Sequence, residues 1–243
     1  MGGNRTAGFT IIESILFFAI SGALVIGILG GAGYAINVQR YRDATTSLVS
    51  YLQGQYDLVI NVQNDRDPHL ACDIIAKIHD AGASNRPAGM TECAIVGRFI
   101  QTTDGVTYTS SQVFADVKKS VVTDDVTSLV DAQPFSSPAF VESTTYSLAW
   151  GTRAVLPPPD SDTPMAPFSM LIVRAPASGT VMTFIGNTSA DTPQSLVVDP
   201  SAQRQAVICL DSQGLFNGER SGAIVLRGAA NSSGVKEVAG GEC

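Results

Sequence analysis

A single carboxylate, that of Glu13, lies within an apolar segment that covers residues 9–36. This segment is longer than the about 20 residues that a helix needs to cross a hydrocarbon core. A charge in such a segment is costly unless it is paired, so Glu13 is a candidate functional residue. Phe9 lies four positions earlier, on the same face of a helix. If the chain were cut before Phe9, the new amine of Phe9 could therefore pair with Glu13, either within one chain or between neighbouring chains.

Gly8 directly precedes the apolar segment. In a secretory signal the cleavage site follows the apolar region, whereas a cut after Gly8 would leave the whole region on the mature chain. Gly8, Phe9, Thr10, Glu13 and the apolar run behind them resemble the N-terminus of type IV prepilins. They equally resemble the pseudopilins of type II secretion and competence systems. The resemblance covers roughly the first quarter of the chain.

This resemblance implies that a prepilin peptidase removes a leader at residues 1–8 and that Phe9 is then N-methylated. The chain would cross the cytoplasmic membrane once, with its head outside, and would later join a cell-surface filament of pilins. Glu13 and Phe9 would specify assembly through their ion pair. The implied fold class is α+β, with a long N-terminal helix packed on an antiparallel β-sheet head, as in pilins.

The long helix is expected in two parts. Residues 9–36 would form the transmembrane and assembly part, and residues 37–64 an amphipathic continuation with an apolar stripe. That stripe comprises Tyr41, Thr45, Leu48, Leu52, Tyr56 and Val59. Small residues every fourth position would let helices pack closely in the first part: Ala19, Ala23, Gly27, Gly31 and Ala35. Glycines at 30, 31 and 33 weaken the helix there.

Residues 65–243 are expected to form a globular β-rich head. Hairpins are predicted from residues 94–102 with 106–110, and from residues 168–175 with 180–185. Further strands are predicted at residues 142–148, 152–156, 205–210 and 223–227. Residues 72–79 are assigned to a short helix and residues 155–167, which are rich in proline, to an exposed loop. Asp124 and Asp125 are assigned to a solvated turn.

Four cysteines in an exported domain predict two disulfides, for which three pairings exist. We expect pairing between neighbours, Cys72 with Cys93 and Cys209 with Cys243, because the second bond would tie down the last residue. A rival interpretation is a zinc site made by the first two of these cysteines with His69 and His79. The oxidising compartment and the irregular spacing favour disulfides over this metal site.

The sequence contains none of the G-x-S-x-G, P-loop or H-E-x-x-H motifs, so we expect no catalytic residue, enzyme activity or cofactor. Asp211, Asn217 and Glu219 suggest calcium, but their spacing does not match an EF-hand loop. A net charge of −7 argues against bulk affinity for nucleic acid. The favoured function is a pilin or minor pilin. The alternatives are a pseudopilin of a secretion or DNA-uptake system, and a tip subunit whose head binds DNA or a host surface.

Overall fold

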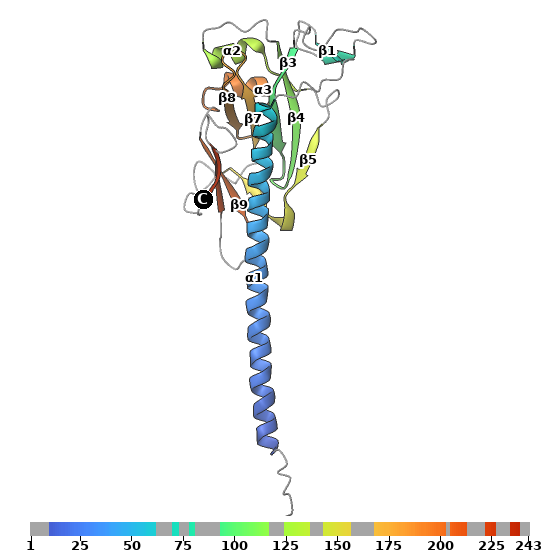
Figure 1. Ribbon diagram of the computed structural model, residues 1–243, viewed down its shortest axis with the longest axis vertical. Helices are drawn as coiled ribbons and strands as arrows, with labels where there is room; N and C mark the ends of the chain where they lie inside the picture. Colours follow the sequence, from blue (N-terminus) through green and yellow to red (C-terminus); the bar gives the residue numbers. More distant parts are fainter. Residues whose placement is uncertain are drawn as a thin grey trace, which may run out of the picture.

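The structure is a computed structural model. It describes residues 10–61, 70–72, 78–80, 93–116, 124–136, 143–156, 168–202, 205–212, 222–226 and 234–238. A long helix carries a β-rich head around its C-terminal half, and its N-terminal half projects away from the head (Figure 1). The fold is α+β, as predicted, and all of its described strand pairs are antiparallel.

Helix α1 (Ile11–Ile60) is continuous for 50 residues and passes through the glycines at 30, 31 and 33 without a break. It begins with a capping box, in which Thr10 and Glu13 satisfy each other's backbone N–H groups. It ends at Asn61, whose N–H donates to the carbonyl of Asp57. The predicted apolar stripe of the second half is confirmed, because Thr45, Leu48, Leu52, Tyr56 and Val59 are buried and Tyr41 packs against them.

A five-stranded sheet forms the centre of the head, with the order β5-β4-β3-β7-β8. Its strands are β3 (Cys93–Thr102), β4 (Thr107–Asp116), β5 (Thr144–Ser147), β7 (Ser169–Arg174) and β8 (Val181–Gly186). Both predicted hairpins, β3 with β4 and β7 with β8, are confirmed. The first hairpin turns at Gly105, which has φ +72°, while the carboxylate of Asp104 accepts from the N–H groups of Val106 and Thr107.

A four-stranded sheet with the order β11-β10-β9-β6 lies beside the same helix. Its strands are β6 (Arg153–Val155), β9 (Ala206–Asp211), β10 (Gly222–Leu226) and β11 (Val235–Val238). The strands predicted at 142–148 and 152–156 exist as β5 and β6, but each belongs to a different sheet. The chain changes sheets through the single turn of 3₁₀ helix η1 (Ala149–Gly151).

The short helix predicted for residues 72–79 is wrong, because its described ends lie in strands. β1 (Leu70–Cys72) pairs with β2 (Ile78–Asp80), and Cys72 lies opposite Ile78. The stretch between them carries two more isoleucines, at positions 74 and 75. β-Branched residues disfavour helices and favour extended backbone, which agrees with the observed ends.

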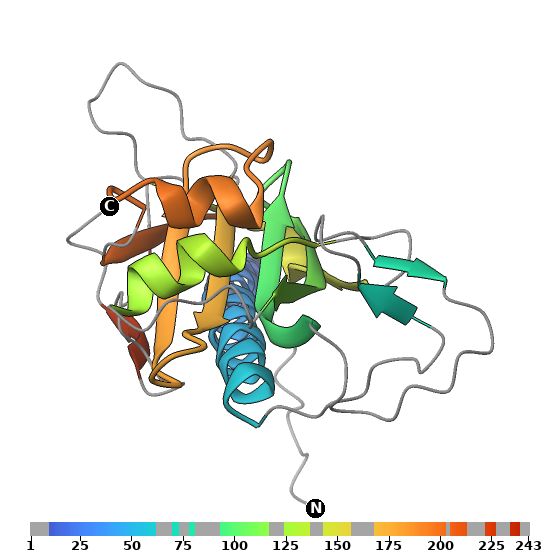
Figure 2. The same cartoon turned by 90° about the horizontal axis from the view of Figure 1, so that it is seen from above.

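Two short helices cover the face of the five-stranded sheet that is opposite α1 (Figure 2). Asp124 is the N-cap of α2 (Asp125–Ala132), and its carboxylate accepts from the N–H of Thr127. The solvated turn predicted at Asp124 and Asp125 is therefore wrong, since these residues start a helix. Thr192 caps α3 (Pro193–Val198), which has proline at its first position.

The main core lies between the second half of α1 and both sheets. Leu48, Leu52 and Tyr56 on α1 have no exposed surface. They pack in one cluster with side chains from strands of both sheets: Ile100, Tyr108, Met170, Ile172, Ile185, Ile208, Leu210, Ile224, Leu226 and Val235. The second half of α1 is thus the central element of the head's core, and the first half is an extension of the same rod.

Candidate functional site

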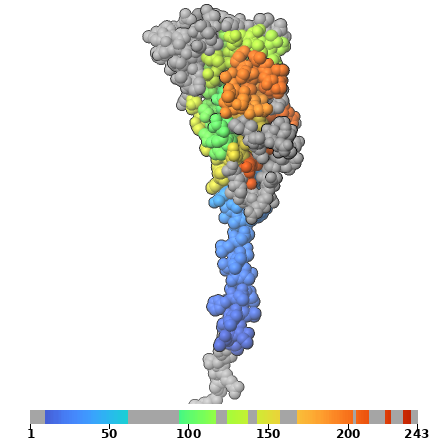
Figure 3. Space-filling model, turned by 180° about the vertical axis from the view of Figure 1, so that it is seen from behind, coloured from blue at the N-terminus to red at the C-terminus, as the bar shows by residue number. Residues whose placement is uncertain are grey.

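The N-terminal half of α1 stands clear of the head with its apolar side chains exposed (Figure 3). Among the described residues, α1 is the one helix that is long and apolar enough to cross a membrane, and its most apolar stretch has no buried residue. The exposed large side chains include Ile11, Ile12, Ile15, Leu16, Phe17, Phe18, Ile20, Leu24, Val25, Ile26, Ile28 and Leu29. Monomers in water rarely expose so much contiguous apolar surface. This surface therefore needs lipid or other protein around it.

Glu13 lies at the tip of this exposed rod, and its carboxylate is turned back to the start of the helix. Its Oε2 accepts from the backbone N–H of Thr10 at 3.0 Å and from the Thr10 hydroxyl at 3.0 Å. The N–H of Glu13 donates to Thr10 Oγ1 at 3.3 Å. A carboxylate in the first turn also meets the positive end of the helix dipole. The side chain is thus held at the helix start, with local hydrogen bonds in the monomer.

Gly8 and Phe9 lie outside the described residues, so the predicted processing site and the amine of Phe9 stay predictions. Covalent connectivity nevertheless relates them to the observed cap. Thr10 directly follows Phe9, and its N–H remains a peptide N–H whether or not the chain is cut after Gly8. The cap on Glu13 therefore survives processing, and a new amine at Phe9 would arise on the residue next to Thr10, whose N–H donates to the Glu13 carboxylate.

The predicted stripe of small residues is exposed along its whole length, at Ala19, Ala23, Gly27, Gly31 and Ala35. A Cβ atom added at Gly27 or Gly31 would meet no atom within 4 Å. Packing within the chain therefore gives no reason for glycine at these two positions. A close approach by another helix would give one, because small residues let helix backbones come together.

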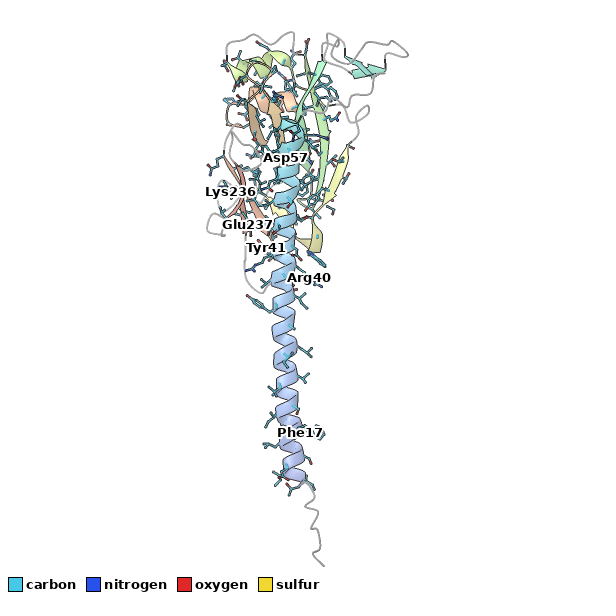
Figure 4. The ribbon with its side chains drawn as sticks, viewed as in Figure 1. Phe17, Arg40, Tyr41, Asp57, Lys236 and Glu237 are labelled. Atoms are coloured by element: carbon cyan, nitrogen blue, oxygen red, sulfur yellow. The ribbon has the colours of Figure 1, made fainter. Side chains whose placement is uncertain are left out.

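Hydrogen bonds join the second half of α1 to both sheets and set its position. Tyr41 donates to the carbonyl of Leu210 at 3.0 Å, and the amide of Gln53 donates to the carbonyl of Val235 at 3.3 Å. On the other sheet, the hydroxyl of Ser110 donates to Gln55 Oε1 at 2.7 Å. Figure 4 shows Tyr41 and Asp57 on the part of α1 that lies along the head, and Phe17 on the part outside it.

Tyrosines strengthen this attachment. The ring of Tyr51 on α1 stacks on Tyr146 of β5, with centroids 4.3 Å apart and planes at 10°. The hydroxyls of Ser47 and Tyr146 lie 2.8 Å apart, and those of Tyr56 and Thr183 lie 2.7 Å apart. The stacked ring pair and the buried Tyr56–Thr183 hydrogen bond each contribute about 1 kcal/mol, whereas the Ser47–Tyr146 contact is exposed. These contacts therefore fix the second half of α1 against both sheets of the head.

Alkaline pH is expected to loosen this attachment through Tyr56. Burial raises the pKa of Tyr56 to about 12, and the hydrogen bond with Thr183 lowers this pKa by a smaller amount. An unfolded tyrosine titrates near pH 10. The folded chain therefore keeps a proton that the unfolded chain loses. The contribution of Tyr56 to the free energy of unfolding is therefore fully present below about pH 10. It falls by about 3 kcal/mol as the pH rises towards 12.

The check is the free energy of unfolding between pH 8 and 12, followed by circular dichroism of the head in detergent. Tyr56→Phe should be less stable at pH 8 by about 1–3 kcal/mol, because it leaves buried Thr183 without its partner. Its stability should nevertheless fall less steeply above about pH 10 than that of the unmodified chain. An equal slope for both proteins would show that Tyr56 does not cause the alkaline loss.

The cysteine and metal predictions fall largely outside the described residues. Cys209 on β9 is disulfide-bonded and only 3% exposed. Cys243 and the side chains of Cys72 and Cys93 lie outside the described residues, so both pairings stay predictions. The same holds for His69, for the side chain of His79, and for Asn217 and Glu219 of the calcium set. Asp211 is described and lies exposed at the end of β9.

Metal-ligating side chains do not gather in threes within the part of the chain that the structure describes. The exposed loop predicted for residues 155–167 lies outside that part from residue 157 onward, and Val155 and Leu156 are buried. Comparisons with known proteins find no family model, curated protein or solved structure that matches this chain.

Sequence reasoning missed one contact where the head ends on α1. The guanidinium carbon of Arg40 lies 4.9 Å from the centroid of the Trp150 ring, a cation–π contact. Trp150 belongs to η1 and has the left-handed backbone, with φ +63°. The single tryptophan, in a segment rich in turn residues, could have been noted as a candidate functional residue. Its partner Arg40 lies on a helix 110 positions earlier, and residue spacing does not reveal such a contact.

Proposed function

We propose that this chain is a structural subunit, a pilin or minor pilin, of a type IV pilus-like filament that polymerises through the N-terminal half of α1. One observation carries the proposal. A single rigid helix buries its second half in the head and exposes its first half, which is apolar except for the carboxylate of Glu13 and a few hydroxyls. Such a rod fits lipid before assembly and the helices of neighbouring subunits afterwards.

Glu13 supplies the specificity of this assembly. After a prepilin peptidase cuts behind Gly8, Phe9 carries a charged amine, and neither this amine nor the carboxylate is stable alone in an apolar environment. Each subunit brings one half of an ion pair, and the carboxylate of one chain meets the amine of its neighbour. The local cap that Thr10 gives to Glu13 keeps the carboxylate at the helix start, where a neighbouring amine can reach it.

The stripe of small residues supplies the close contact between helices in this proposal. The glycines at 27 and 31 have open space around them, so another helix backbone can approach them. The subunit would begin as a single-pass protein of the cytoplasmic membrane with its head outside, and would end in a filament on the cell surface.

The stripe gives the proposal a matched test. Gly31→Leu fills the stripe, whereas Gly33→Leu adds the same side chain about 200° around the helix. Both positions are open, with nothing within 4 Å, and both changes raise helix propensity by about the same amount. We expect Gly31→Leu to lower the yield of sheared filaments about tenfold or more, equivalent to about 1.4 kcal/mol per contact. Gly33→Leu should leave the yield within about twofold.

The measurement is the amount of the chain in the sheared filament fraction, relative to the amount in the membrane. Equal yields from both variants would show that the stripe is not the contact surface. Absence of the unmodified chain from filaments in its own cells would contradict the proposed function itself.

A further inference from the structure

Trp150 is displayed on the surface by an unusual backbone. It is the chain's single tryptophan, and 51% of its surface is exposed. Its φ is +63°, and the next residue, Gly151, has φ +70°. A bulky residue with positive φ is rare, and such conformations collect at functional sites. The five-residue connection between β5 and β6 thus holds a large aromatic ring outward, where it covers no core.

The contact with Arg40 shows where Trp150 lies along α1. Figure 4 shows Arg40 at the edge of the head from which the bare half of the helix emerges. Arg40 lies four residues after Ile36, the last residue of the apolar segment. Tyr34 and Ile36, just before it, are 52% and 48% exposed. The Trp150 ring and Arg40 therefore lie directly beyond the apolar segment, and Tyr34 lies near the end of that segment.

The length of the helix relates this position to a bilayer. Twenty-nine residues separate Arg40 from Ile11, and at about 1.5 Å per residue they span about 44 Å. A bilayer with both headgroup layers is about 40–45 Å thick. With the start of α1 at one face, Arg40 and Trp150 lie in the headgroup layer of the other face.

We propose that Trp150 and Arg40 form a membrane-interface contact that seats the head on the outer leaflet while the subunit is anchored. Tryptophan prefers the boundary between headgroups and acyl chains, where its ring is in apolar surroundings and its N–H is in polar ones. Arginine binds lipid phosphates through its fork of N–H donors, and the guanidinium of Arg40 already lies over the Trp150 ring. The occupant of this surface is the phospholipid headgroup layer, which is continuous with the surface around the apolar half of α1.

This contact would fix the tilt and height of the head above the membrane, because hydrogen bonds join α1 to both sheets of the head. The inference rests on the anchored state in the proposed function, but it does not need a filament. In this inference the head itself contacts lipid, through the connection between β5 and β6. This contact is additional to the lipid contact of helix α1.

The single tryptophan allows a direct test by fluorescence. The full chain is reconstituted into vesicles of phosphatidylcholine and phosphatidylglycerol that carry brominated lipids, with the bromines either near the headgroup or near the chain ends. Aqueous iodide probes exposure to water. The reference is a double variant, Ile26→Trp with Trp150→Phe. Ile26 lies midway between Ile11 and Arg40 on α1 and is 74% exposed, so it should report the bilayer centre.

We expect the bromines near the chain ends to quench the reference variant more strongly. The bromines near the headgroup should quench the unmodified chain more strongly. Iodide quenching of Trp150 should be reduced several-fold relative to free tryptophan. Quenching of Trp150 by iodide alone, with a deep reference, would overturn the headgroup contact and leave the membrane span intact. Protection from iodide without quenching by either lipid would show that another subunit covers Trp150, which also overturns it. A reference that deep bromines fail to quench would contradict the span, and with it the anchored state.

Discussion

Glu13→Gln is expected to leave the chain in the membrane with a folded head and to abolish its assembly into filaments. Glutamine keeps the shape of glutamate and can still accept the N–H of Thr10, so the capping box is retained. The change removes only the negative charge. A neighbouring amine then has no counter-charge in an apolar environment, and losing one side of a buried pair costs about 3–5 kcal/mol. Repeated at every contact, that cost stops polymerisation.

A control separates this effect from helix capping. Thr10→Val removes the hydroxyl that accepts from the N–H of Glu13 but keeps the carboxylate. Loss of a cap costs about 1 kcal/mol, at one end of a helix of 50 residues. Thr10→Val should therefore still assemble, while Glu13→Gln and Glu13→Ala should not. All variants are expressed without unmodified subunits, and sheared filaments are compared with membrane content. Normal filament yield from Glu13→Gln would show that this charge does not specify assembly.

Gly8→Leu is expected to block processing, so that residues 1–8 stay attached and no filament forms. A bulky side chain beside the scissile bond hinders close approach of the peptidase to the backbone. Without the cut, the nitrogen of Phe9 remains an amide and offers no charge to Glu13. Gly8→Ala, with one added methyl group, is the matched control and should be processed. Intact mass in cells that carry a prepilin peptidase distinguishes the two forms. Full processing of Gly8→Leu would contradict cleavage at this bond.

Strong local signals made the long helix and the main strands predictable. Tyr41, Leu48 and Val59 belong to a stripe with helical spacing, and one core receives nearly all of it. The hairpin of β3 and β4 follows from two apolar runs around Asp104 and Gly105, because only a tight turn fits between them. In these elements the local pattern and the tertiary packing favour the same structure.

The remaining elements depend on distant contacts that spacing does not show. The β5 and β6 strands are adjacent in sequence, but β5 pairs with β4 and β6 with β9, because Trp150 and Gly151 turn the chain from one sheet to the other. Strand β11 has only four residues and gains its identity by pairing with β10. Asp124 did carry a helix-start signal, with Val126, Leu129 and Val130 behind it, but two adjacent aspartates also suit a turn.

The site was predictable in chemistry and less so in geometry. A lone carboxylate in an apolar run identifies Glu13 from the sequence alone. Three features arise only in the folded chain: the turn of that carboxylate back towards Thr10, the open space around Gly27, and the contact of Arg40 with Trp150. Each of these depends on how a side chain or a distant loop is oriented, which residue spacing does not determine.

The intact mass of the mature protein, with sequencing of its first residues, tests the central claim most directly. Protein from membranes and from sheared filaments should begin at Phe9, carry one methyl group on its amine, and retain Glu13 as its fifth residue. An intact Met1, or a mature chain that begins after Ile36 and so lacks the exposed half of α1, would contradict the account.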